Sequence, residues 1–129
     1  MEYQLKKEEK YSIYKPLDKN INRAVSPTLK SQFIFLRTEG IRNLIIDISE
    51  VQFIDSDGLS ALLLGRREFE DNNSGSFVLT GLSTMVKSLL EITKLDDILK
   101  ITPTVEEAIE LIYMEELERE ITGESSEDA

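Results

Sequence analysis

The chain contains neither cysteine nor histidine among its 129 residues. Without cysteine, a disulfide framework and a thiolate zinc site are excluded. Without histidine, so are a Ser-His-Asp triad, imidazole metal ligands and the side chain that most often acts as a general base near neutral pH. No apolar run approaches the roughly 20 residues of a membrane-spanning helix, and the first residues lack the apolar stretch of a signal peptide. We therefore expect a cytoplasmic protein with no direct membrane insertion, no metal and no cofactor.

Basic residues are outnumbered by acidic ones, 15 against 25, and the net charge is −10. Such a balance argues against binding to the phosphates of a nucleic acid, which needs a basic face, but permits a basic protein partner. Seven acids and one base lie in residues 115–129, which we expect to form an acidic, disordered tail. Residues 1–114 have the length and apolar content of one globular domain. Nothing in the sequence specifies an oligomeric state.

Hydrophobic periodicity predicts strands that alternate with helices. The expected strands are residues 3–7, 11–17, 44–48, 77–79 and 98–101. Helices are expected from Ser26 as N-cap to Gly40, from the segment that opens with Asp55 to Asn72, and after the caps Ser83 and Thr104. The third of these carries the apolar spacing Met85, Leu89, Ile92. This order predicts an α/β fold with an N-terminal hairpin, a mixed sheet with mainly parallel core strands, and about four helices.

The DSDG loop (Asp55, Ser56, Asp57 and Gly58) stands between a buried strand and the start of a helix. Unpaired N–H groups and a partial positive charge make a helix N-terminus a natural seat for an anion. At the least, Ser56 or Asp57 would cap this helix, and Gly58 would ease the entry from the strand. A cap alone does not explain two acids around a serine, so a binding or catalytic role is also considered.

One such role is enzymatic. A hydrophobic strand followed by Asp-x-Asp-Gly resembles the first motif of haloacid-dehalogenase-type phosphatases, in which the first Asp attacks phosphorus and the second acts as acid or base. A magnesium ion could then lie between Asp55 and Asp57. Against this, Leu59 stands where that family has Thr or Val, and the motif follows a hairpin and a helix instead of lying near the start. The enzyme is therefore the alternative, not the leading interpretation.

A longer resemblance covers residues 3–113. The stretch LIIDISEVQFIDSDGLSALLLGRREF is similar to the STAS domains of anti-sigma-factor antagonists, in which an apolar strand precedes Asp-Ser-Ser/Thr-Gly and a leucine-rich helix. The later stretches FVLTGLSTMVKSLLEITKLDDILKI and TPTVEEAIELI resemble the family's last strands and helices. The resemblance implies a non-catalytic module that binds an anti-sigma factor which is also an ATP-using serine kinase. An adaptor subunit of a transporter or signalling complex is a further alternative.

The family's phosphate usually goes on the residue before the glycine, which here is Asp57 and not Ser or Thr. A serine kinase cannot modify it, so Asp57 would be a permanent, weaker imitation of the modified state, because a phosphate brings about −1.5 to −2 charges and a carboxylate −1. In one hypothesis the protein is locked in this phospho-like condition and binds a different partner. In the other, Ser56 is the acceptor, or no phosphorylation occurs and binding alone is the function. We favour a binding module without a conventional switch at Asp57.

Four further residues complete the predicted binding surface. The resemblance places Asn22 and Arg23 beside the DSDG loop, where Arg23 would pair with Asp55, Asp57 or an acid of the partner, or be an ordinary surface arginine. Leu59 and Leu62 would give a partner apolar anchors, or would be plain core.

Overall fold

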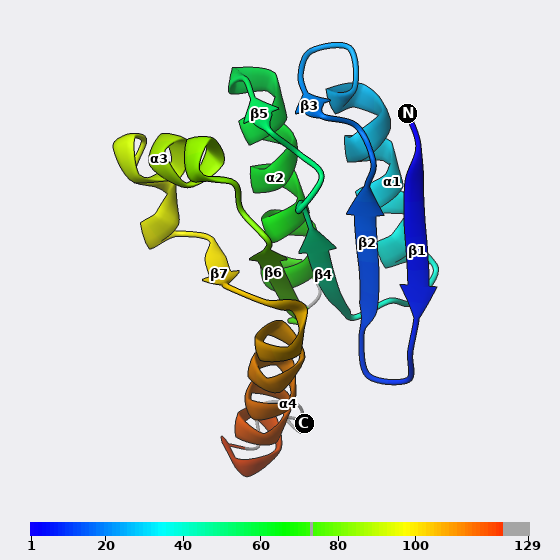
Figure 1. The fold of residues 1–129 in the computed structure, drawn as a ribbon. Coiled ribbons are helices and arrows are strands. Elements are labelled where there is room, and N and C mark those ends of the chain that lie inside the picture. The colour runs from blue at the N-terminus through cyan, green and yellow to red at the C-terminus, as the bar shows by residue number, and fades with distance from the viewer. Residues whose placement is uncertain (73, 123–129) are drawn as a thin grey trace.

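The N-terminal half of the main sheet begins with the expected hairpin (Figure 1). The computed structural model describes residues 1–72 and 74–122. Strand β1 (Tyr3–Lys7) pairs antiparallel with β2 (Ser12–Pro16), with Tyr3 opposite Pro16. The sheet continues in parallel through β4 (Asn43–Asp47), β6 (Ser76–Thr80) and β7 (Lys100–Thr102), in the order β1-β2-β4-β6-β7. The predicted mixed sheet with a parallel core is confirmed.

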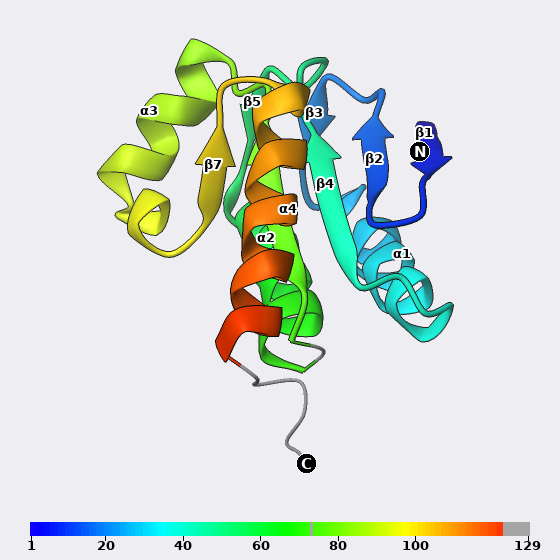
Figure 2. The ribbon, with the colours of Figure 1, turned by 90° about the horizontal axis from the view of Figure 1, so that it is seen from below.

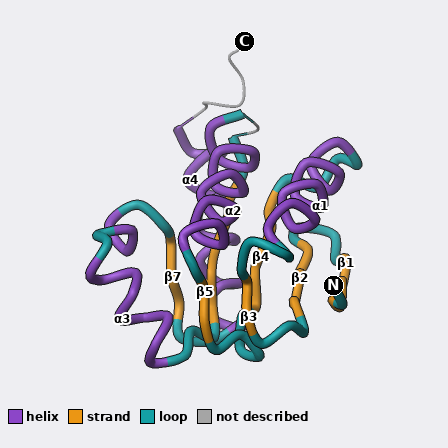
Figure 3. Tube along the Cα trace, turned by 90° about the horizontal axis from the view of Figure 1, so that it is seen from above, coloured by secondary structure: helices purple, strands orange, loops and turns teal. Residues whose placement is uncertain are grey.

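Two layers of helices cover this sheet (Figures 2 and 3). On one face lie α1 (Ser26–Thr38) and α2 (Ser56–Arg66), the latter continuing in a π-helical turn, η1 (Arg67–Asp71). On the other lies α4 (Val105–Thr122), where Ala108 and Ile112 pack on Ile45 and Val78. Because both faces are covered, β4 and β6 are continuous apolar runs without alternation. None of the helices in the described ranges is long and apolar enough to cross a membrane.

A second, two-stranded sheet was not predicted. Strand β3 (Asn20–Ile21) pairs in parallel with β5 (Phe53–Ile54), and the amide of Asp55 donates to the carbonyl of Ile21 over 3.2 Å. This pairing fixes the segment before α1 against the segment before α2. It therefore positions the candidate site, although each strand is too short to show a period in sequence.

Helix α3 (Thr84–Ile92) has the predicted cap, because the Ser83 hydroxyl accepts from the amide of Val86 over 3.1 Å. Its buried face differs from the predicted one: Val86 and Leu90 are buried, whereas Met85 and Ile92 are 62% and 78% exposed. A short 3-10 helix, η2 (Leu95–Asp97), then leads to β7.

The expected domain boundary at residue 114 is not where the helix ends. Helix α4 is continuous over 18 residues to Thr122, so residues 115–122 are not a tail. Two of the acids that suggested a tail face the domain instead: Glu115 pairs with Lys100 over 2.6 Å, and Glu116 with Arg42 over 3.2 Å. The rest of the expected tail, residues 123–129, lies outside the described residues.

Candidate functional site

Asp55 holds the start of α2 with both oxygens of its carboxylate. Oδ1 accepts from the amide of Gly58 over 2.9 Å, and Oδ2 accepts from the amide of Arg23 over 3.1 Å. The N-cap is therefore Asp55, and the expectation that Ser56 or Asp57 caps this helix is wrong. Asp55 is the cap because its backbone is extended and its second carboxylate oxygen also accepts from the amide of Arg23, 32 residues away.

Gly58 is needed for space more than for backbone freedom. It is buried where α2 crosses β3, and a Cβ atom there would lie 2.2 Å from the carbonyl oxygen of Ile21 and 2.6 Å from Cγ2 of Ile54. No side chain fits at those distances. The glycine thus lets the first turn of α2 approach the β3–β5 pair closely, which is a different reason from the eased entry expected from the sequence.

Ser56 and Asp57 are the exposed members of the loop. Asp57 lies in the first turn of α2, where the partial positive charge of the helix end favours a carboxylate. Its backbone carbonyl accepts from the Ser26 hydroxyl over 2.8 Å, so its position is fixed while its side chain is exposed. Ser26 is buried and is the first residue of α1, not its predicted N-cap, because its hydroxyl is committed to Asp57.

Asn22 and Arg23 lie beside the loop, as the resemblance implied. The Asn22 side chain is used locally, since its Oδ1 accepts from the amides of Ala24 and Val25 over 3.0 and 3.3 Å. The Arg23 side chain is exposed, and it forms no ion pair with Asp55 or Asp57 within the part of the chain that the structure describes. What links Arg23 to Asp55 is its backbone amide, so its guanidinium is available to a partner.

The two leucines of the predicted surface differ. Leu62 is fully buried in the main core, so the core alternative applies to it and it presents no side chain to a partner. Leu59 packs against the same core but remains half-buried. Of these two leucines, Leu59 is therefore the one that can add apolar contact next to the loop.

The sequence did not reveal an apolar depression between β5 and α3, next to the loop. Its lining includes Phe53, Met85 and Ile92, which are 46%, 62% and 78% exposed. The helical spacing of Met85 and Ile92 resembled a core face, so the pattern itself concealed this surface. The exposure of Phe53, which precedes the buried Ile54 and the DSDG loop, became visible only with the fold.

This arrangement favours binding over chemistry. Both oxygens of Asp55 accept backbone N–H groups, which leaves Asp57 as the one exposed carboxylate of the loop. A nucleophile with both oxygens committed as a helix cap is poorly placed for attack, and the other carboxylate faces outward instead of into a cleft. The loop instead offers a fixed charge, a hydroxyl and a neighbouring apolar surface, which suit a protein partner.

Comparison with known proteins places this geometry in a family. The STAS domain model matches residues 4–108. A candidate anti-sigma factor antagonist from Thermotoga maritima is similar at 25% identity and a TM-score of 0.80, over 86% of this chain and 94% of its own. At 18% identity, the Bacillus anti-sigma factor antagonist SpoIIAA, known in unphosphorylated and phosphorylated forms, gives a TM-score of 0.72 in the unphosphorylated form over 87% of this chain and 96% of its own.

A sulfate transporter family protein from Wolinella succinogenes shares the fold at 20% identity and a TM-score of 0.63, over 83% of this chain and 85% of its own. The fold thus occurs in more than one functional setting. The family match itself extends over most of the sequence, from β1 into α4. The chain therefore belongs to the STAS domain family.

Proposed function

We propose that this STAS domain is a non-catalytic regulatory module that binds a protein partner through the DSDG loop, Arg23 and Leu59. The partner class that the family resemblance supports is an anti-sigma factor that is also a serine kinase. The proposal rests on the different roles of the two acids in the loop. The carboxylate of Asp55 caps the helix, whereas Asp57 is fixed through its backbone carbonyl and leaves its side chain exposed. A fixed, exposed charge serves recognition.

Asp57 occupies the place before the glycine that carries phosphate in the resembled family. A carboxylate there supplies a constant negative charge, which is smaller than the charge of about −1.5 to −2 on a phosphate. The same helix end stabilises both groups. The Bacillus protein SpoIIAA exists in unphosphorylated and phosphorylated forms. In this chain we propose that Asp57 keeps the loop permanently in a phosphate-like charged state, so that binding requires no phosphorylation.

Affinity capture from extract of the native cell tests the proposal. Tagged wild-type protein, Asp57→Ser and the charge reversal Asp57→Lys serve as baits, with and without ATP, and bound proteins and phosphosites are identified by mass spectrometry. The expected result is an ATP-binding regulatory protein recovered by the wild type and lost by Asp57→Lys. Asp57→Ser is expected to gain phosphate at residue 57 when ATP is present.

The matched control is Glu9→Lys, because Glu9 is an exposed acid in the turn between β1 and β2. It reverses the same charge away from the DSDG loop, so its bound proteins should equal those of the wild type. Phosphate on Ser56 of the wild type would contradict the permanent state. Recovery of a membrane transporter in place of a soluble regulator would favour the adaptor role.

The enzyme alternative has its own test. Wild-type protein and Asp55→Asn are incubated with a generic phosphate ester and magnesium, and released phosphate is measured. We expect no turnover by either protein, since Asp55 acts as a cap. Robust turnover that Asp55→Asn abolishes would overturn the binding role in favour of phosphate transfer.

A further inference from the structure

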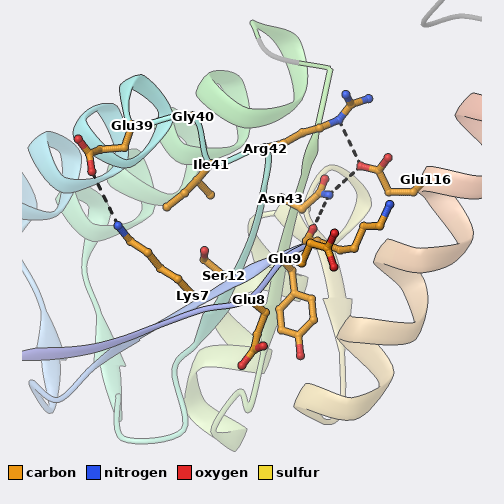
Figure 4. A pocket seen from close by; sticks show the side chains of 12 residues that line it. Lys7, Glu8, Glu9, Ser12, Glu39, Gly40, Ile41, Arg42, Asn43 and Glu116 are labelled. Atoms are coloured by element: carbon orange, nitrogen blue, oxygen red, sulfur yellow. Dashed lines mark hydrogen bonds and ion pairs between the residues drawn. The ribbon is translucent and has the colours of Figure 1, made fainter.

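The C-terminal half of α4 places three of its charged side chains, Glu115, Glu116 and Arg119, toward the domain. Glu115 and Glu116 lie within ion-pair distance of Lys100 and Arg42, and the Arg119 guanidinium donates to the Ser76 hydroxyl over 2.9 Å and to Glu116 over 3.0 Å. Figure 4 shows Glu116 pointing from the helix toward Arg42 and Asn43. An amphipathic surface helix usually does the reverse and turns its apolar side inward.

The opposite side of the same helix is apolar and exposed. Tyr113, Met114, Leu117 and Ile121, here called the α4 stripe, are 48%, 63%, 55% and 75% exposed. Their spacing of i, i+1, i+4 and i+8 puts them on one side of a helix, at about 100° per residue. Tyr113 touches Tyr11 edge-on at one flank, with ring centroids 6.3 Å apart. An apolar side two turns long, on a helix held by ion pairs on its other side, is arranged for a partner.

The charges around the stripe indicate what can cover it. Glu110 precedes it, and Glu118 and Glu120 flank it on either side, all of them exposed. The one basic residue of this helix, Arg119, is turned inward and paired. A second copy of the chain would bring one acidic rim against another, and an anionic membrane would be repelled in the same way.

We propose that the α4 stripe is the docking site for an amphipathic helix of another protein, whose apolar side carries basic residues along its edges. Such a helix would place two or three apolar side chains on the stripe and its lysines or arginines against Glu110, Glu118 and Glu120. This is distinct from the proposed function. The last turns of α4 contact Asn43, Ser76 and Lys100, where β4, β6 and β7 begin, whereas the DSDG loop lies past the ends of strands.

The test uses a defined probe, an amphipathic helical peptide of leucine and lysine, with a leucine and glutamate peptide of the same pattern as its matched control. Backbone amide shifts of the isotope-labelled full chain are followed by NMR during titration. We expect saturable shifts confined to α4 around residues 110–122 with the lysine peptide and none with the glutamate peptide. Raising NaCl from about 0.05 M to about 0.5 M should weaken the binding severalfold, because exposed charges are then screened.

Two variants place the binding on the stripe. Leu117→Glu is expected to weaken the lysine peptide at least about tenfold. The matched control is Ile92→Glu on α3, which adds the same charge at an exposed apolar residue and should leave binding unchanged. If Leu117→Glu lowers the unfolding temperature, Met114→Gln, which adds no charge, replaces it with the same expected loss.

Three results of the titration would overturn the proposal. They are shifts centred on the DSDG loop or the α3 depression, equal binding of the glutamate peptide, and unchanged binding by Leu117→Glu and Met114→Gln. Sedimentation of the protein without peptide tests the other possible occupant of the α4 stripe, a second copy of the chain. A dimer that Leu117→Glu dissociates would show that a second copy covers the stripe instead.

Discussion

The hydroxyl of Ser26 donates a hydrogen bond to the backbone carbonyl of Asp57 over 2.8 Å, across 31 residues of sequence. It joins the first turn of α1 to the first turn of α2 and is part-buried. Together with the bond from the Arg23 amide to Asp55, it holds the helix starts and the turn before α1 as one unit. The backbone of Asp57 is therefore fixed without any use of its carboxylate.

Asp55→Ala should lower the free energy of unfolding by about 1–2 kcal/mol, because the amides of Gly58 and Arg23 lose their acceptor. Asp57→Ala, the matched control, should cost less than about 1 kcal/mol, since it removes an exposed charge near the helix end. Urea denaturation measures both. Equal losses would contradict the separate roles of the two acids.

Gly58→Ala should destabilise the protein by about 2 kcal/mol or more, because the new Cβ would meet the Ile21 carbonyl oxygen and Ile54. Ser60→Ala, two residues further along α2 at an exposed position, should leave stability within about 0.5 kcal/mol. Thermal unfolding compares the two. A Gly58→Ala protein as stable as the wild type would mean that α2 does not cross β3 this closely.

Tyr14 gives stability an alkaline limit. Burial raises the pKa of its phenol well above the usual range, and Tyr3 and Asp18 add to the shift. Because the folded pKa lies above the unfolded value of about 10, the contribution is complete below that pH and falls as the pH rises beyond it. On going from neutral to high pH, Tyr14→Phe should therefore lose less stability than the wild type does. The unfolding temperatures of both proteins, measured from neutral to alkaline pH, check this, and profiles that stay parallel would contradict it.

Arg119→Ala should loosen the end of α4, because its guanidinium links Ser76, Glu115 and Glu116. We expect a loss of about 1–3 kcal/mol and faster amide exchange over residues 115–122. Glu118→Ala, at an exposed position of the same helix, is the control and should change neither. Slow exchange that persists in Arg119→Ala would mean that other contacts hold this helix.

The sequence predicted most of the main sheet because its strands are either alternating segments or continuous apolar runs bounded by polar turns. Strands β3 and β5 have two residues each and leave no such signal. On α3, the set Met85 and Ile92 and the set Val86 and Leu90 are all apolar, so helical spacing cannot select the buried one. The end of α4 was missed because Glu115 and Glu116, the inner residues, resemble solvent-exposed ones.

The sequence predicted that the DSDG loop lies at the start of a helix, but not which of its residues caps that helix. Asp55, Ser56 and Asp57 are all good cap residues, and adjacent residues cannot be separated by local propensity. The choice of Asp55 depends on a donor from Arg23, 32 residues away, which only the tertiary structure supplies. For the same reason, the core role of Leu62 became visible only with the fold.

Calorimetry of the captured regulatory protein tests the binding role of Asp57 most directly. It compares the affinity for the wild type with that for Asp57→Lys, and Glu9→Lys is the control. We expect the dissociation constant to rise at least about tenfold for Asp57→Lys and to stay unchanged for Glu9→Lys. All three proteins should unfold at similar temperatures. Equal affinity of the wild type and a folded Asp57→Lys would contradict the claim that this carboxylate is presented to a partner.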